Sequence, residues 1–124
     1  MTNIAGVFFT ARSFLPHILE GTPGKIAIIS SRMGSQELAD SNAPIYRASK
    51  AAATNLARTM AVELAPQGVA VGAFHPGWVR TDMGGPQAST SPQDSAAGLL
   101  HRFDALSLKT TGIYEDFQGN ELPF

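Results

Sequence analysis

A chain of 124 residues has the common length of one domain, and with 44% hydrophobic and 15% charged residues it is too apolar to be a disordered tail. Nine Lys and Arg against ten Asp and Glu give a formal net charge of −1, and the basic residues are scattered, so neither nucleic acid nor a membrane surface is expected as a partner. The absence of Cys excludes disulfides, thiolate metal sites and cysteine nucleophiles, and it favours a cytoplasmic location.

The first half of the chain predicts a helix, a strand and a second helix. Apolar residues at helical spacing predict a helix over residues 4–20. Arg12 and His17 interrupt its apolar character, so the segment resembles neither a secretory signal nor a membrane span. After a break at residues 21–24, the Ile-rich run 25–31 predicts a short strand that is buried on both faces. The Ala-rich segment 45–65 predicts the longest helix of the chain.

The second half begins with another strand. Residues 68–74 form an uninterrupted apolar run, so strand, helix and strand predict a βαβ unit with parallel strands. Residues 75–91 are rich in Gly, Pro, Ser and Thr and predict a long loop. Ser91 and Pro92 then predict the start of a third helix, and residues 113–117 a short final strand. The fold class is therefore α/β.

Tyr46 and Lys50 lie four residues apart at the start of the predicted helix 45–65, so they share one helix face. An ammonium group and the positive end of a helix both favour the phenolate form of Tyr, which could then exchange a proton with a substrate hydroxyl or carbonyl. Ser31 ends the first strand, and ligands of parallel sheets collect at that edge. These three residues predict a proton-transfer site.

The same sequence also allows other interpretations of its Tyr, Lys, His and Asp residues. A Tyr four residues before a Lys is common by chance, and alone it also fits a surface Tyr beside a solvated Lys. His75 with Asp82 could belong to a Ser-His-Asp set, but the chain has no G-x-S-x-G turn to expose the Ser. His17 and His101 stand alone, so no metal site is expected.

Four motifs stand in a fixed order along nearly the whole chain. They are Asn3-Ile-Ala-Gly, Gly24-Lys-Ile-Ala-Ile-Ile-Ser-Ser-Arg-Met-Gly34, Tyr46-Arg-Ala-Ser-Lys-Ala-Ala52 and His75-Pro-Gly-Trp-Val-Arg-Thr-Asp-Met-Gly-Gly85. In order and spacing the chain resembles the short-chain dehydrogenases/reductases (SDRs). The last motif is especially similar to the branch that includes the C-factor and sniffer-like carbonyl reductases.

The resemblance implies catalytic roles for four residues. Tyr46 would be the acid/base, Lys50 would favour its phenolate and bind the nicotinamide ribose, and Ser31 would steady the substrate oxygen. Asn3 would hold the water of a proton relay, although a helix N-cap explains it equally well. Ser30 adjoins Ser31, but strand alternation sends the two side chains to opposite sides.

The resemblance also implies a cofactor, either NADP or NAD, between which the sequence does not choose. Besides Tyr46 and Lys50, the cofactor-binding positions would be Pro76, Gly77, Val79 and Thr81, which match the family's stretch around the nicotinamide and the pyrophosphate. A Gly beside Pro suits close backbone approach. The substrate would be a small carbonyl compound or secondary alcohol, and an apolar pocket is suggested by Trp78, Met83, Leu99 and Phe103.

The family fold begins with a strand and a Gly-rich phosphate loop, and neither residues 21–24 nor Gly84-Gly85 fit such a loop. We therefore expect residues 1–124 to be a single partial domain, the C-terminal half of a Rossmann-like doubly wound parallel sheet, with about three strands and three helices. The first strand should have an unpaired apolar edge, and cofactor affinity should be weak.

Three functional explanations stay open. The chain is the C-terminal part of an NAD(P)-dependent oxidoreductase, inactive or weakly active alone; a non-catalytic interaction or signalling fragment; or an inactive remnant. The family's dimers suggest a homodimer through helices 4–20 and 45–65, with close approach at Ala53, Ala57 and Ala61. These alanines could equally pack against the chain's own sheet.

Overall fold

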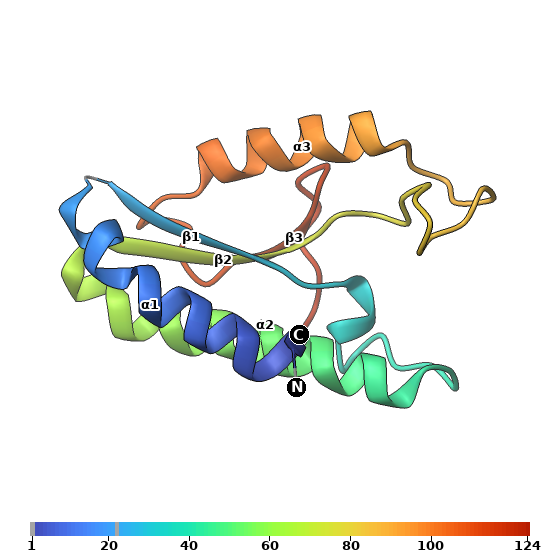
Figure 1. Ribbon diagram of the computed structural model, residues 1–124, viewed down its shortest axis with the longest axis horizontal. Helices are drawn as coiled ribbons and strands as arrows, with labels where there is room; N and C mark the ends of the chain where they lie inside the picture. The colour runs from blue at the N-terminus through green and yellow to red at the C-terminus, as the bar shows by residue number, and fades with distance from the viewer. Residues whose placement is uncertain (1, 22) are drawn as a thin grey trace.

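A computed structural model describes residues 2–21 and 23–124 and consists of a parallel sheet between two helical layers (Figure 1). The elements follow one another in an alternating α/β order that confirms the predicted fold class. Their bounds are η1 Thr2–Gly6, α1 Val7–Glu20, β1 Gly24–Ile29, η2 Arg32–Gly34, α2 Pro44–Leu64, η3 Ala65–Gln67, β2 Val69–His75, α3 Pro92–Ala105 and β3 Tyr114–Asp116.

The sheet has the strand order β1-β2-β3, and both neighbouring pairs are parallel. β1 and β2 pair over six positions, from Gly24 opposite Val69 to Ile29 opposite Phe74. β3 is short and pairs only with the last residues of β2. The predicted parallel βαβ unit is therefore confirmed, and the carboxyl ends of all three strands lie at one edge of the sheet.

α1 and α2 cover one face of the sheet, and their contacts with β1 and β2 form the larger core. Small side chains on α2 let the helix lie close to the strands: Ala53, Ala57 and Ala61 are at most 2% exposed. These alanines pack inside their own chain, so they do not support the predicted dimer. The buried members of this core are Ala11, Ile26, Ile28, Ala53, Ala57, Met60, Ala61, Leu64, Val69, Val71, Ala73 and Tyr114.

α3 covers the opposite face of β2 and forms a second, smaller core (Figure 1). Ser91 caps α3 by accepting a hydrogen bond from the Asp94 backbone N–H at 3.1 Å, as predicted. Phe103 packs edge-on against Phe74 with ring centroids 5.2 Å apart, and Leu99 also contacts this core. Leu99 and Phe103 are therefore partly buried against this core, and their part in a substrate pocket stays a prediction.

β1 is an edge strand, and one of its faces is open. Ile26 and Ile28 are buried under α1 and α2, whereas Ala27 and Ile29 point the other way and are exposed, Ile29 by 43%. The predicted burial on both faces is wrong for β1, because α3 packs over β2; in the described residues α3 is joined to β1 by hydrogen bonds from Lys25 to the Phe103 and Asp104 carbonyls. β2 is buried on both faces, and the predicted unpaired edge of β1 is confirmed.

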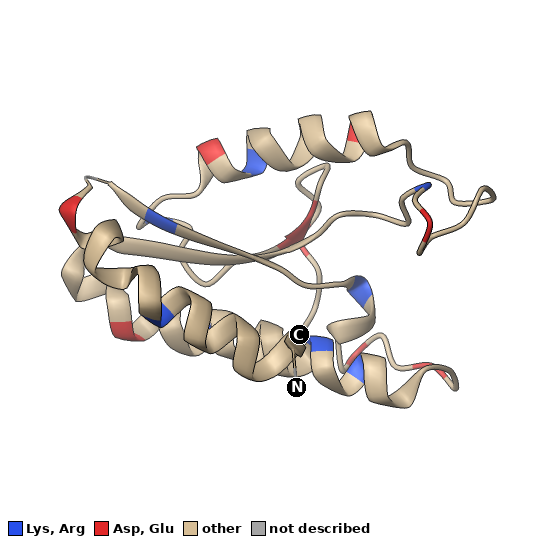
Figure 2. Cartoon of the chain, viewed as in Figure 1, with Lys and Arg blue, Asp and Glu red and all other residues tan. Residues whose placement is uncertain are grey.

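Lys and Arg, and Asp and Glu, are scattered over the helices, strands and loops of the described residues (Figure 2). One ion pair is found in the described residues, between Arg102 on α3 and Glu115 on β3, at 2.8 Å. No helix within residues 2–21 and 23–124 is long and apolar enough to cross a membrane.

Candidate active site

The two serines at the end of β1 have different partners. Ser30 is buried and joins β1 to α2: its hydroxyl lies 2.6 Å from the Thr54 hydroxyl and donates to the Lys50 carbonyl at 3.2 Å. Ser31 accepts a hydrogen bond from the Met33 backbone N–H at 3.1 Å, which starts η2. Because that bond uses an acceptor site of the hydroxyl, its own hydrogen stays available to another oxygen.

Lys50 connects α2 to the end of β1. Its ammonium donates to the Ile29 carbonyl at 3.2 Å, two residues before Ser31, and lies 5.8 Å from the centroid of the Tyr46 ring. Burial lowers the pKa of the Lys50 ammonium, since its charge is partly removed from water. The structure thus brings the Lys50 ammonium to the end of β1 that carries Ser31, and the Tyr46 ring lies near that ammonium.

A glycine makes this arrangement sterically possible. η2 follows Ser31 directly and packs against α2 at Lys50, and a Cβ at Gly34 would lie 2.8 Å from the Lys50 carbonyl carbon and oxygen. Backbone atoms cannot yield as the end of a side chain can, so only glycine allows η2 to approach α2 this closely.

Asn3 lies inside η1, not before a helix, and the α1 cap position, Gly6, makes no side-chain capping bond. The N-cap interpretation of Asn3 is therefore wrong. Its side-chain amide donates to the Ser49 hydroxyl at 3.1 Å, and that hydroxyl donates to the Tyr46 carbonyl at 2.8 Å. Ser49 connects Asn3 to the turn of α2 that carries Tyr46, a role that sequence reasoning missed.

The stretch after β2 is held by contacts with the start of α3 and within the following loop. The Pro76 carbonyl accepts from Ser95 of α3 at 2.6 Å, and Gly77 has φ 89°, in the left-handed region. Val79 forms a bridge with Thr90, and the Thr81 hydroxyl accepts from the Gly84 N–H at 3.2 Å. A Cβ at Gly77 would lie 2.8 Å from the Phe117 ring, so the glycine is required by packing within the chain.

A further residue reaches the site from β3. Tyr114 is 2% exposed, and its hydroxyl donates a hydrogen bond to the Ser31 backbone carbonyl. Burial raises the pKa of the Tyr114 phenol to about 12, although Thr54 and the Arg32 guanidinium oppose the rise. No local sequence signal points to this contact, because the two residues are far apart in the chain.

The profile of the short chain dehydrogenase family matches residues 1–92 of the sequence. The chain belongs to this family. C-signal from Myxococcus xanthus is 39% identical to this chain. The match covers 98% of this chain and 74% of C-signal. The 1-hydroxy-2-glutathionyl-2-methyl-3-butene dehydrogenase of Rhodococcus is 34% identical over 97% of this chain and 54% of its own.

Solved structures give the same assignment. The carbonyl reductase Sniffer of D. melanogaster and the NADPH-bound carbonyl reductase from chicken fatty liver each superpose with a TM-score of 0.92 at 29% identity, over 99% of this chain. The match covers 54% of each of those two reductases, so this chain spans about half of their length. The predicted resemblance to the C-factor and sniffer-like branch is confirmed, as is the incomplete Rossmann-like sheet.

His75 and Asp116 are further titratable groups near the strand ends. Asp116, on β3, is the carboxylate that acts on His75, while Asp82 lies in the exposed loop after β2. Burial lowers the pKa of His75, the Asp116 charge raises it and the Arg32 charge lowers it. Over residues 2–21 and 23–124, no three His, Asp or Glu side chains are grouped as metal ligands.

Proposed function

We propose that this chain supplies the catalytic half of a nicotinamide-dependent oxidoreductase that interconverts a carbonyl compound and a secondary alcohol. The observation that carries the proposal is the position of the Lys50 ammonium, 5.8 Å from the Tyr46 ring centroid and 3.2 Å from the carbonyl of Ile29, two residues before Ser31. A general acid, a cation that stabilises its conjugate base and a hydroxyl donor are the parts that the proton transfer of carbonyl reduction needs, and the hydride comes from the cofactor.

In the reducing direction, the Tyr46 hydroxyl transfers its proton to the carbonyl oxygen of the substrate. Lys50 stabilises the resulting phenolate, and the Ser31 hydroxyl, whose hydrogen is free, donates to the same substrate oxygen. Asn3 is fixed to α2 through Ser49, and its amide oxygen is suited to hold a water that returns the proton. In the oxidising direction the proton moves the opposite way.

The cofactor would be NADP or NAD, which supplies or accepts the hydride when bound. Tyr46 and Lys50 would hold its ribose, and Pro76, Gly77, Val79 and Thr81 would contact the nicotinamide half. The position of these residues supports a cofactor site at this edge of the sheet. β1 and β2 are parallel neighbours, so their carboxyl ends lie side by side, and the loop after β2 begins at that edge. The 124 residues contain no G-x-G-x-x-G loop for the phosphates, so this chain alone should bind the cofactor weakly.

A calorimetric titration of the purified chain with NADPH and then NADH tests cofactor binding. We expect binding weaker than micromolar for both, because the charge-assisted bonds of a phosphate loop are missing. Micromolar binding by a folded monomer would contradict this part of the proposal. A variant with Gly77→Ala should lose the remaining binding, and Gly6→Ala, on η1, serves as its control.

A second candidate is an interaction or signalling role without catalysis. The name of the C-signal relative is one reason to keep this candidate, and the free edge of β1 is the structural reason. A hollow of about 490 Å³ runs along this edge and is lined by β1 together with Val7 and Phe14 of the first helix. A folded chain that binds neither nucleotide at any accessible concentration would favour this candidate.

A further inference from the structure

A second hollow opens at the carboxyl edge of the sheet, next to the candidate catalytic serine. Its volume is about 610 Å³, enough for a small organic molecule. Its wall comes from the segments that follow β1, β2 and β3 and from the start of α3. The lining residues used below are Arg32, His75, Trp78, Asp94, Asp116 and Phe117.

Arg32 provides an unused positive charge in this wall. It follows Ser31 directly, its side chain is exposed, and among the described residues its guanidinium makes no hydrogen bond or ion pair. Glu37 and Asp40 line a neighbouring hollow together with Arg32, yet neither forms an ion pair with it. The guanidinium therefore keeps its planar set of donors free for a ligand.

His75 provides an unused polar atom in the same wall. Its Nδ1 is shielded from solvent and has no hydrogen-bond partner in the described part of the chain. A buried ring nitrogen without a partner costs free energy. Arg32 and His75 come from two different strand ends, and of these two side chains the exposed Arg32 guanidinium is the one that is open to a ligand.

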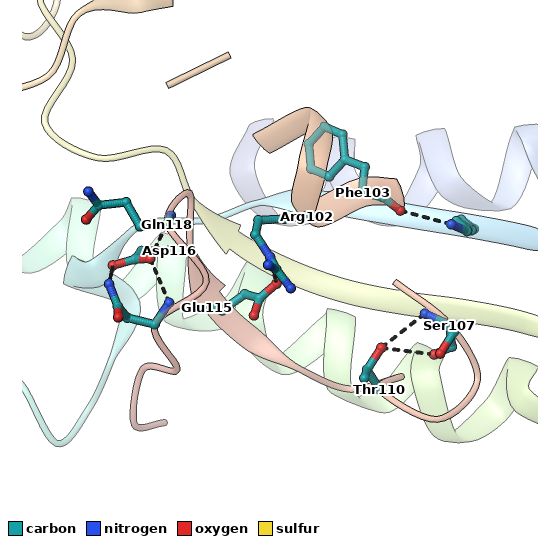
Figure 3. Close-up of polar contacts among 9 residues, drawn as sticks. Arg102, Phe103, Ser107, Thr110, Glu115, Asp116 and Gln118 are labelled. Atoms are coloured by element: carbon teal, nitrogen blue, oxygen red, sulfur yellow. Dashed lines mark hydrogen bonds and ion pairs between the residues drawn. The ribbon is translucent and has the colours of Figure 1, made fainter. Parts of the chain in front are cut away.

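Two carboxylates also line the hollow, and their negative charges would oppose binding of an anion. Asp116 is engaged within its own turn: its carboxylate accepts from the Gln118 and Asn120 backbone N–H groups, both at 2.9 Å, and from the Asn120 side chain at 3.0 Å (Figure 3). These bonds, most of all those from Asn120, lower the pKa of Asp116 in spite of burial. Asp94 belongs to α3 and is exposed to water, which screens its charge.

We propose that the hollow binds a carboxylate of the substrate, so that the substrate class is an oxo acid or the corresponding hydroxy acid. Arg32 binds the carboxylate, while the neighbouring Ser31 holds the carbonyl oxygen. Trp78 and Phe117 contact the apolar remainder of the molecule. This inference rests on the proposed function for the identity of the reacting carbonyl, but the carboxylate site itself can be tested without turnover.

The test uses three aromatic ketones of similar size and different charge: benzoylformate, its neutral methyl ester, and the cationic phenacylamine. Trp78 is the only Trp in the chain, so its indole N–H signal in a proton–nitrogen NMR spectrum reports on the hollow without further assignment. Titration of the full chain with benzoylformate should shift this signal. The ester should bind at least about tenfold more weakly, which corresponds to the loss of one charged hydrogen-bonded contact.

Arg32→Gln should reduce benzoylformate binding about tenfold and leave the weak ester binding unchanged. Arg12→Gln, on α1 away from the hollow, is the matched control and should bind as the unchanged chain does. The proposal is overturned if the folded chain does not bind benzoylformate, if the ester binds equally well, or if Arg32→Gln has no effect. Tighter binding of phenacylamine would also overturn it, since Asp94 and Asp116 would then dominate.

Tyr46→Phe separates this inference from the proposed function. It should abolish any reduction of benzoylformate by NADPH and leave the NMR-detected binding intact. Binding that depends on Arg32, in a chain that reduces no carbonyl compound even with NADPH bound, would uphold the carboxylate site and reject the proposed function. Reduction of benzoylformate that depends on Tyr46, with binding that does not depend on Arg32, would uphold the proposed function and reject the carboxylate site.

Discussion

The Tyr114 hydroxyl on β3 donates to the backbone carbonyl of Ser31, 83 residues earlier in the chain. Ser31 in turn starts η2, so this bond fixes the backbone that presents the candidate catalytic hydroxyl. β3 therefore does more than extend the sheet: it brings a buried phenol to the end of β1, which it does not neighbour.

The stability of the chain in alkali should depend on Tyr114. Burial raises the pKa of this phenol from 10.0 to about 12, so the folded state holds the proton more tightly than the unfolded state. Its contribution is fully present below pH 10 and is lost as the pH rises toward 12, by up to about 1.4 kcal/mol per pH unit.

Urea unfolding at a series of pH values measures this effect, with Tyr114→Phe as the reference because that variant cannot ionise. At neutral pH the variant should be less stable by about 1–3 kcal/mol, since the buried Ser31 carbonyl loses a partner. The difference should shrink between pH 10 and 12. A constant difference across that range would show that Tyr114 does not ionise on unfolding.

Gly34→Ala should displace η2 from α2. The new Cβ would meet the Lys50 carbonyl at 2.8 Å, and relieving this contact should cost about 1–3 kcal/mol of unfolding free energy. Gly6→Ala is the control, because a Cβ there has only the Thr2 methyl within range, at 3.8 Å, and should be neutral or stabilising. Equal stability of both variants would contradict the proposed close approach.

The ion pair of Arg102 and Glu115 should couple α3 to β3 (Figure 3). The Glu115 side chain is 4% exposed and that of Arg102 30%, so removing Arg102 leaves a buried, uncompensated carboxylate. Arg102→Met should therefore destabilise the chain by about 3 kcal/mol. In a double-mutant cycle, Arg102→Met in a Glu115→Gln background should cost much less, and strictly additive effects would argue against coupling.

A homodimer through the outer faces of α1 and α2 is still a prediction. Its support is now the set of exposed apolar side chains on the two helices, not the buried alanines; Phe9, Phe14 and Val62 are 61%, 58% and 76% exposed. Sedimentation velocity should show a species that grows with concentration and is lost in Val62→Glu. A constant monomer in the unchanged chain would reject the dimer, and the same measurement on Leu108→Glu, outside both helices, controls for added charge.

Much of the fold could be predicted because it depends on local patterns. The helical spacing before residue 20, the Ala-rich run after Pro44 and the Ser91 cap each specify an element through short-range contacts, and the structure has these elements within a few residues. Burial of β1 on both faces could not be predicted correctly. An apolar strand has the same sequence pattern whether or not a helix covers its second face. In this fold α3 lies over β2, so the second face of β1 is left open.

The candidate site likewise contains some contacts that the sequence predicts and others that it does not. Tyr46 and Lys50 are neighbours on one helix turn, so their spacing alone brings them together. Ser49, Tyr114 and His75 gain their roles from residues distant in sequence: Asn3, Ser31 and Asp116. Such contacts depend on how the sheet is assembled, and no local pattern in the sequence encodes them.

The central claim is that Tyr46, Lys50 and Ser31 form a proton-transfer site for nicotinamide-dependent reduction. The most direct test is the initial rate of ketone reduction by the folded chain at rising NADPH concentration, beside Tyr46→Phe and the surface control His101→Gln. We predict slow turnover that does not saturate with NADPH, is retained in His101→Gln and falls by at least about 100-fold in Tyr46→Phe. Equal rates in the unchanged chain and Tyr46→Phe, or no turnover by a folded chain with bound NADPH, would contradict it.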